Sequence, residues 1–215
     1  MGAPVARGAT AKRREGLDVP GEFYLIIIDR RMVMKKYNTW MLAEASMMIG
    51  LSVILGEFIK VFKMPMGGSV TAGSMVPLFI FAFRWGGKKG MLAGAVYGIL
   101  DLIIGGIFSI HPFSLIFDYP VAFAMLGIAG FFRKNTLGIL GGVFTGIAGR
   151  FICHVLSGVV AYASYAPEGQ SPWVYSILYN GTFLLPEFII TIVLTLLILK
   201  FIKLPEPKLD NIKRA

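Results

Sequence analysis

The chain has 215 residues, of which 56% are hydrophobic and only 15% are charged, and its formal net charge is +9. Soluble domains carry about a quarter charged residues, so this composition, with a mean hydropathy of +0.72, excludes an ordinary soluble domain and predicts an integral membrane protein. The positive charge does not indicate nucleic acid binding, because lysine and arginine collect at the ends of apolar segments and in the terminal segments. The single cysteine, Cys153, lies in an apolar run and can form no intrachain disulfide, so we expect a buried thiol.

Six apolar segments follow one another along the chain, and a membrane helix needs about 20 such residues. We expect helices over 40–62, 74–85, 89–107, 115–132, 137–163 and 174–202. The predicted fold class is therefore all-α, an integral membrane bundle of six transmembrane helices. We expect residues 1–36 to form a cytoplasmic segment that is flexible or interfacial, 37–205 the membrane domain, and 206–215 a cytoplasmic tail.

The positive charges predict the orientation of this bundle. Lysine or arginine occurs in the N-terminal segment, in the connections near 84–89 and 133–134, and in the C-terminal tail, whereas the connections near 107–115 and 163–174 contain none. Because positive charge concentrates on the cytoplasmic side, we expect a multi-pass protein of the cell membrane with both termini in the cytoplasm. The uncharged, aromatic connections then face outward.

Small residues recur at four-residue spacing, which lets helix backbones approach closely. Gly94 and Gly98 form one such pair, 138–146 contains a GxxxGxxxG run, and Ser46 and Gly50 form a third pair. Packing within this chain is the favoured interpretation for each motif taken alone. The alternative is docking to a partner membrane protein.

Ionisable residues inside apolar segments are costly and therefore invite a functional hypothesis. The candidates are Glu44, Glu57, Asp101, Asp118, His154 and Glu187. Under the predicted topology, several polar and aromatic side chains fall in the outer halves of their helices, namely Asp118, Tyr119, His154, Tyr162, Tyr175 and Asn180. One acid, several π faces and a few hydrogen-bonding groups suit a flat ligand that is cationic, amide-like or heteroaromatic. We expect the aromatic segment 164–181 to build and cover an outward-facing binding pocket.

Several catalytic signatures are missing. There is no GxxxxGK[ST] phosphate loop, so the sequence indicates no ATPase activity of its own. The two histidines, 43 positions apart, and the one cysteine form no recognisable metal site, and we expect no metal and no cofactor. Ser157 follows His154 by three residues and could suggest an intramembrane hydrolase, although a small packing residue is the simpler interpretation.

Four runs of the sequence carry a family resemblance: LAEASMMIGL, MPMGGSV, GGIFSIHPFSLIFDYPVAFAMLGIAGFF and RFICHVLSGVVAYASYAPEGQSPWVYSILYNGTFLLPE. Over residues 37–203 the chain resembles the thiamine-specific substrate-binding component, or S-component, of energy-coupling factor (ECF) transporters. The resemblance implies six transmembrane helices of the S-component type and high-affinity capture of thiamine, vitamin B1, from outside. It also implies a transmembrane coupling subunit and two ATPase subunits as partners.

The resemblance also implies site residues. The family's acid–tyrosine pair corresponds to Asp118 and Tyr119, where the aspartate is one methylene shorter than the glutamate of some members. Its histidine corresponds to His154, and the aromatic residue eight positions later to Tyr162, where some members carry tryptophan. The remaining correspondences are Tyr175, Asn180 and, on the third helix, Tyr97. The first outer connection, with Met66, Gly67 and Gly68, resembles the family's gate, and Ser46 and Gly50 its docking motif for the coupling subunit.

Three alternatives stay open on the sequence alone. The first is the same architecture with a thiamine precursor or another vitamin as ligand. The second is an intramembrane enzyme that uses His154 and Ser157, and the third is a structural membrane partner without a ligand.

Overall fold

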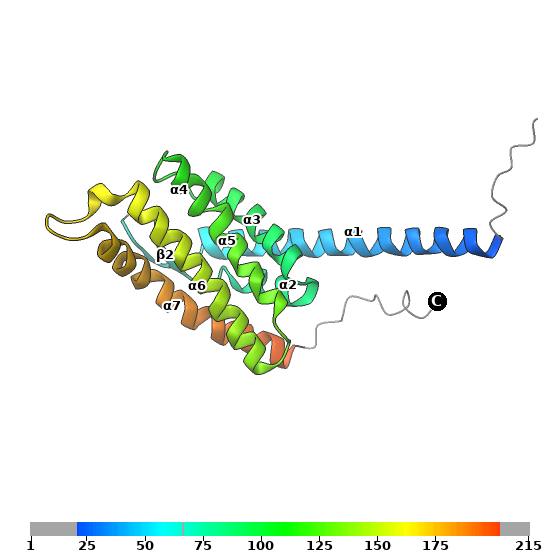
Figure 1. Ribbon diagram of the computed structural model, residues 1–215. Helices are drawn as coiled ribbons and strands as arrows, with labels where there is room; N and C mark the ends of the chain where they lie inside the picture. Colours follow the sequence, from blue (N-terminus) through cyan, green and yellow to red (C-terminus); the bar gives the residue numbers. More distant parts are fainter. Residues whose placement is uncertain (1–20, 66, 203–215) are drawn as a thin grey trace, which may run out of the picture.

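The computed structural model describes residues 21–65 and 67–202. Within these residues it contains seven α-helices, two short 3₁₀ helices and a two-stranded sheet (Figure 1). In chain order the elements are α1 (Gly21–Glu57), β1 (Lys60–Lys63), β2 (Ser69–Thr71), α2 (Val76–Trp85), α3 (Gly87–Ile104), α4 (Pro112–Phe117), α5 (Pro120–Leu126), η1 (Gly127–Phe131), α6 (Thr136–Ala161), η2 (Ala163–Tyr165) and α7 (Pro172–Phe201). The predicted tail, 206–215, lies outside the described residues.

The helices form a bundle that agrees with the predicted all-α architecture of six membrane segments. Four segments are long and apolar enough to cross a membrane, at 38–57, 112–131, 136–161 and 172–201. The other two are α2 and α3. In α2, nine of the ten residues are buried, as expected for a helix that is hydrophobic all round and lies inside the protein. α6 and α7 lie antiparallel along one side of the bundle, and α3 packs against α5 on the other.

The first helix differs from the prediction at both ends. It begins at Gly21 rather than near residue 40, and it ends at Glu57 rather than near 62. At about 1.5 Å per residue, α1 is roughly 55 Å long, and it projects beyond the other helices (Figure 1). The residues predicted as its last turn instead form β1, which pairs antiparallel with β2. The connection between the first two helices is therefore a β-hairpin, which the sequence analysis did not predict.

The fourth membrane segment is broken, so the prediction of one helix over 115–132 is wrong in this detail. α4 ends at Phe117, α5 begins at Pro120, and Tyr119 between them adopts φ −115° and ψ −91°. Proline lacks a backbone N–H and disfavours helical geometry in the residue before it. Pro120 therefore accounts for the break, which places Asp118 and Tyr119 at a junction inside the bundle.

The glycine motifs of α3 and α6 serve packing within the chain, as the favoured interpretation predicted. A Cβ atom on Gly98 would lie 2.5 Å from the carbonyl oxygen of Tyr119, and one on Gly146 would lie 2.9 Å from the ring of Phe79. The α1 pair differs, because Ser46 is exposed and a Cβ atom on Gly50 would meet no described atom within 4 Å. This face of α1 is thus open in the part of the chain that the structure describes.

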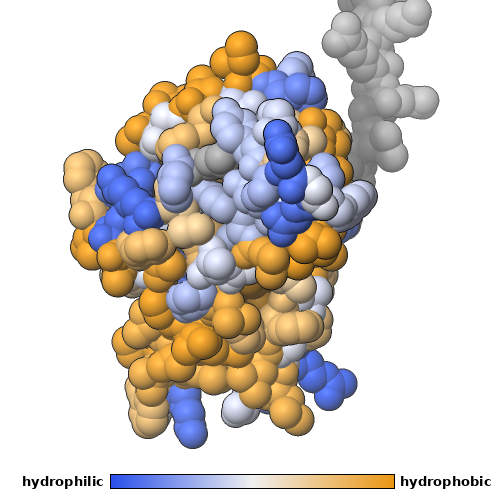
Figure 2. Space-filling model, turned by 90° about the vertical axis from the view of Figure 1, so that its left-hand side faces the viewer, coloured by the Kyte–Doolittle hydropathy of each residue, from blue (hydrophilic) through white to orange (hydrophobic). Residues whose placement is uncertain are grey.

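The described outer surface is largely hydrophobic away from the ends of the bundle. Large apolar side chains are exposed along several helices, for example Leu92, Phe144 and Leu185. Figure 2 looks onto the end of the bundle where the α6–α7 connection lies, and hydrophilic residues gather in its upper part while hydrophobic ones surround them. A lipid-facing belt with a polar end is the pattern expected of a membrane-embedded bundle.

Candidate functional site

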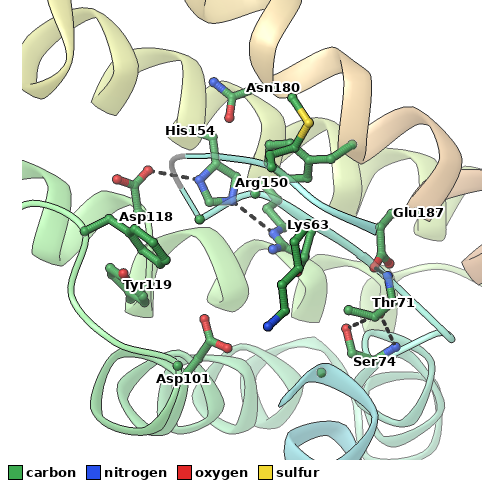
Figure 3. A pocket seen from close by; sticks show the side chains of 18 of the residues that line it. Lys63, Thr71, Ser74, Asp101, Asp118, Tyr119, Arg150, His154, Asn180 and Glu187 are labelled. Atoms are coloured by element: carbon green, nitrogen blue, oxygen red, sulfur yellow. Dashed lines mark hydrogen bonds and ion pairs between the residues drawn. The ribbon is translucent and has the colours of Figure 1, made fainter. Parts of the chain in front are cut away.

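The polar end of the bundle contains a cavity of about 220 Å³, which lies between the β1–β2 hairpin and helices α3, α6 and α7 (Figure 3). This volume suits a small molecule rather than a polymer. The cavity brings together all seven residues that the sequence analysis selected for ligand binding: Tyr97, Asp118, Tyr119, His154, Tyr162, Tyr175 and Asn180.

Asp118 is the centre of a hydrogen-bond network at the break between α4 and α5. Its Oδ2 accepts hydrogen bonds from the hydroxyls of Ser114, at 2.6 Å, and Ser157, and its Oδ1 lies 2.9 Å from Nδ1 of His154. Three donors aimed at one carboxyl group suit a carboxylate, which can only accept. A carboxylate offers about four acceptor positions, so one position on Oδ1 is left for a ligand.

Arg150 determines the protonation of His154. Nε of Arg150 lies 3.1 Å from Nε2 of His154 (Figure 3), and a guanidinium group can only donate. Nε2 must therefore accept, which leaves the proton on Nδ1 and makes His154 a neutral donor to Asp118. The guanidinium also lies 4.2 Å from the ring centroid of Phe123, so it is held by a cation–π contact as well.

The predicted aromatic residues line the walls of the cavity. Tyr97 is 2% exposed and packs edge-to-face on Phe123, with ring centroids 4.6 Å apart. The hydroxyl of Tyr119 donates to the carbonyl of Gly106 at 3.0 Å, and the hydroxyl of Tyr162 lies 3.3 Å from that of Ser114.

Two further predicted residues come from the N-terminal part of α7. The Asn180 amide nitrogen donates to the Ser176 carbonyl at 2.9 Å, which leaves the amide oxygen facing the cavity region (Figure 3). The rings of Tyr175 and Tyr179 lie 6.1 Å apart, and both residues line the cavity. The 164–181 segment therefore contributes one wall through its C-terminal half, whereas Trp173 in its middle is half exposed, at 51%, and does not line the cavity.

The hairpin covers the cavity through its tip. Gly67 and Gly68, two of the predicted gate residues, line the cavity, and the third, Met66, lies outside the described residues. Gly67 has φ +96°, a left-handed conformation that favours glycine. A Cβ atom on Gly67 would lie 2.5 Å from Phe108, and one on Gly68 would lie 2.6 Å from Phe183. The tip is thus seated closely between α7 and the α3–α4 connection.

Charged residues that the sequence analysis did not assign to the site also line the cavity. They are Glu57, Lys60, Lys63, Asp101, Arg150 and Glu187. Lys60 and Glu57 form an ion pair at 3.0 Å. The signal for Arg150 was present in the sequence, because it is an arginine inside an apolar helix, four positions before His154 and hence on the same face.

The Ser157 geometry does not match a hydrolase. A serine nucleophile needs its hydroxyl bonded to the histidine that removes its proton. Here both Ser157 and His154 bind Asp118, so the carboxylate stands between them. Ser157 supports the acid instead, and it is fully buried.

Comparisons with known proteins agree on one family. The family model described as "Thiamine transporter protein (Thia_YuaJ)" matches residues 42–206. The thiamine transporter ThiT of Bacillus subtilis is 40% identical over 171 residues, which cover 73% of this chain and 88% of the relative. ThiT of Lacticaseibacillus paracasei is 35% identical over 135 residues, 55% of this chain and 67% of the relative.

A solved structure extends the agreement to the fold. ThiT from Listeria monocytogenes superposes with a TM-score of 0.67 at 24% identity, and the match covers 76% of this chain and 94% of that one. At this identity the likeness supports the six-helix fold alone. Taken with the family model and the Bacillus relative, it leads to one conclusion: this chain belongs to the thiamine transporter protein family.

Proposed function

We propose that this chain binds thiamine in the cavity beneath the β1–β2 hairpin and acts as the substrate-binding subunit of an ECF-type uptake transporter. The observation that carries the proposal is the Asp118 carboxylate. It is held by three donors, keeps one acceptor position free, and faces a cavity lined with aromatic rings. The chain is a multi-pass membrane protein of a transporter family and not an enzyme.

Thiamine matches this cavity in charge and in shape. Its thiazolium ring carries a permanent positive charge, and its aminopyrimidine ring offers an exocyclic amine. The amine can donate to the free position on Asp118, and aromatic faces attract the cation. We assign the ring contacts to Tyr162, Tyr175 and Tyr97, with Tyr119 beside the acid and Asn180 as a further polar contact.

The charge balance of the cavity supports a cationic ligand. Four carboxyl groups line it, from Glu57, Asp101, Asp118 and Glu187, against three cationic side chains, from Lys60, Lys63 and Arg150. With His154 neutral, the fully ionised set has a net charge of −1, the difference between these four and three groups. One permanent cation would neutralise it, which lowers the cost of enclosing the site beneath the hairpin.

Transport requires partners that supply energy. We assign docking of a transmembrane coupling subunit, with two ATPase subunits, to the open face of α1 around Ser46 and Gly50. We also propose that the cavity opens to the outside of the cell membrane, with both termini in the cytoplasm. The positive charges near 84–89 and 133–134 support this orientation.

The first experiment is a thiamine titration of the full chain purified in detergent, followed by tryptophan fluorescence. We expect saturable binding with one site per chain. The same titration with hydroxymethylpyrimidine and with hydroxyethylthiazole separates the ligands. The first lacks the thiazolium cation, and the second lacks the aminopyrimidine and, because its ring nitrogen is not alkylated, the permanent charge as well. A flat thiamine titration would reject thiamine as the ligand. Tighter binding of either half-molecule would assign the chain to a precursor.

A further inference from the structure

Glu187 is a buried acid that lines the cavity but makes no hydrogen bond to the Asp118 network. It lies on α7, directly after Pro186, and is only 2% exposed. One of its oxygens, Oε1, accepts the backbone N–H of Thr71, a residue 116 positions away in the sequence (Figure 3). The other, Oε2, is buried and accepts no hydrogen bond within the described residues. Burying an acid within a membrane helix costs free energy, so we looked for what its one hydrogen bond stabilises.

The contact satisfies the buried edge of β2 that has no neighbouring strand within the described residues. β2 pairs with β1 along one edge, where Thr71 lies opposite Lys60. The N–H of Thr71 points toward α7 and would have no strand partner there. A buried N–H without a partner is destabilising, and the hydrogen bond to Glu187 removes this cost. The carboxylate takes the place that a third strand would occupy.

Thr71 also lies at the base of the hairpin, at the end of β2. The hydroxyl of Thr71 lies 2.9 Å from that of Ser74 and accepts the backbone N–H of Ser74 at 3.0 Å. This turn joins the hairpin to α2, so Thr71 is the residue about which the hairpin would pivot. The tip, by contrast, meets its neighbours through the rings of Phe108 and Phe183, contacts that can separate without leaving a polar group unpaired.

We propose that Glu187 is a positioning residue that fastens the base of the hairpin to α7 and thereby slows ligand release. This inference rests on the proposed function, because it assumes that the cavity beneath the hairpin holds the ligand. With the base fastened, only the tip moves when the cavity opens. Without the hydrogen bond, β2 detaches from α7 and the whole hairpin moves away from the cavity. Release then becomes faster, whereas entry changes little because the cavity itself is intact.

Two substitutions of Glu187 separate the effect of its side-chain length from the effect of its charge. Glu187→Gln removes the charge but keeps an oxygen at the same distance, so the bond to Thr71 persists. Glu187→Asp keeps the charge but is one methylene shorter, so its carboxylate no longer reaches that N–H. Thr191→Val is the matched control, because Thr191 is also fully buried and lies one turn further along the same face of α7.

Two measurements are made on each full-length variant in detergent. Stopped-flow fluorescence gives the association and dissociation rates of thiamine, and hydrogen exchange of the ligand-free protein gives the protection of the amides at 69–72. For Glu187→Asp we expect at least tenfold faster dissociation, association within threefold of wild type, and at least tenfold faster exchange at 69–72 with α6 unchanged. Thr191→Val should stay within threefold of wild type in every quantity. Glu187→Gln should keep wild-type exchange at 69–72, because its side-chain oxygen still accepts the Thr71 N–H, whatever the loss of one cavity charge does to the rates of thiamine binding.

The opposite pattern would overturn the proposal. If Glu187→Gln is defective and Glu187→Asp is not, the residue acts through its charge on the ligand. If both behave as wild type, the hairpin does not depend on it. Should wild type bind no thiamine, the proposed function fails, but exchange at 69–72 still decides whether Glu187 fastens the hairpin.

Discussion

Replacing Asp118 by asparagine removes one charge from the cavity and changes little in its shape. A cation about 5 Å from this carboxylate, at an effective dielectric constant of about 20, gains roughly 3 kcal/mol. Part of this energy is offset by desolvation, so we expect a net loss of about 2–3 kcal/mol in binding. Since 1.4 kcal/mol corresponds to tenfold in affinity, the thiamine Kd should rise roughly 30- to 150-fold.

The substitution also affects the unbound protein. The amide NH₂ that Asp118→Asn introduces would face one of the donors that the carboxylate now accepts, from Ser114, Ser157 or His154. One unsatisfied buried donor costs about 1–3 kcal/mol, so the midpoint of thermal unfolding should fall by several degrees. The protein should remain folded, because the bundle is held chiefly by apolar packing outside this network.

The assay compares two ligands on two proteins. Thiamine and the neutral hydroxymethylpyrimidine are each titrated against wild type and against Asp118→Asn by tryptophan fluorescence in detergent. The charge argument requires the substitution to weaken thiamine at least tenfold more than the pyrimidine. Equal weakening of both ligands would show that Asp118 acts only through hydrogen bonding. A thiamine Kd within threefold of wild type would refute the placement of the cation beside this acid.

Three further predictions concern packing and the network around the acid. Gly94→Val should lower the midpoint of thermal unfolding strongly, because its side chain would enter the α5 backbone, whereas Gly181→Ala, with no described atom within 4 Å of its Cβ, should not lower it. Arg150→Gln should weaken thiamine about tenfold by releasing the tautomer of His154, and histidine NMR of the labelled protein should show mixed tautomers; a single unchanged tautomer would count against this role. Ser157→Ala removes one of the three donors to Asp118, so the thiamine Kd should rise by less than about tenfold; a larger rise would count against a merely supporting role for this hydroxyl.

Much of the candidate site could be predicted because its residues carry strong signals in the sequence. Asp118 and His154 are ionisable groups within apolar segments, and the aromatic residues near the outer helix ends have polar groups. The predicted helix count and the alternation of charged and uncharged connections brought these residues to one end of the bundle. The structure collects all seven candidates around a single cavity; their contact with a ligand stays a prediction.

The features that sequence reasoning missed depend on contacts between distant segments. The run after Glu57 is apolar enough to continue a helix, and only its pairing with 69–71 makes it a strand. Such short strands are stabilised by partners rather than by their own residues. The break before Pro120 could have been predicted from the sequence, because a proline after Tyr119 disfavours a continuous helix. Hydropathy does not detect this signal and treats the segment as one span.

The donors around Asp118 offset the cost of burying this acid and hold its carboxylate ready for a ligand. Asp118 Oδ2 already accepts two hydroxyl donors, and Oδ1 accepts the His154 N–H, so the carboxylate is held before any ligand arrives. Binding then requires little reorganisation, and only one acceptor position is open. A ligand that offers a single N–H beside a positive charge gains from the open acceptor position and from the negative charge of the carboxylate. A neutral donor gains only the hydrogen bond, and an aliphatic cation without the N–H gains only the charge interaction. Discrimination in this cavity should therefore come from the combination, which is why the two-ligand comparison at Asp118 is more informative than the loss of affinity for either ligand alone.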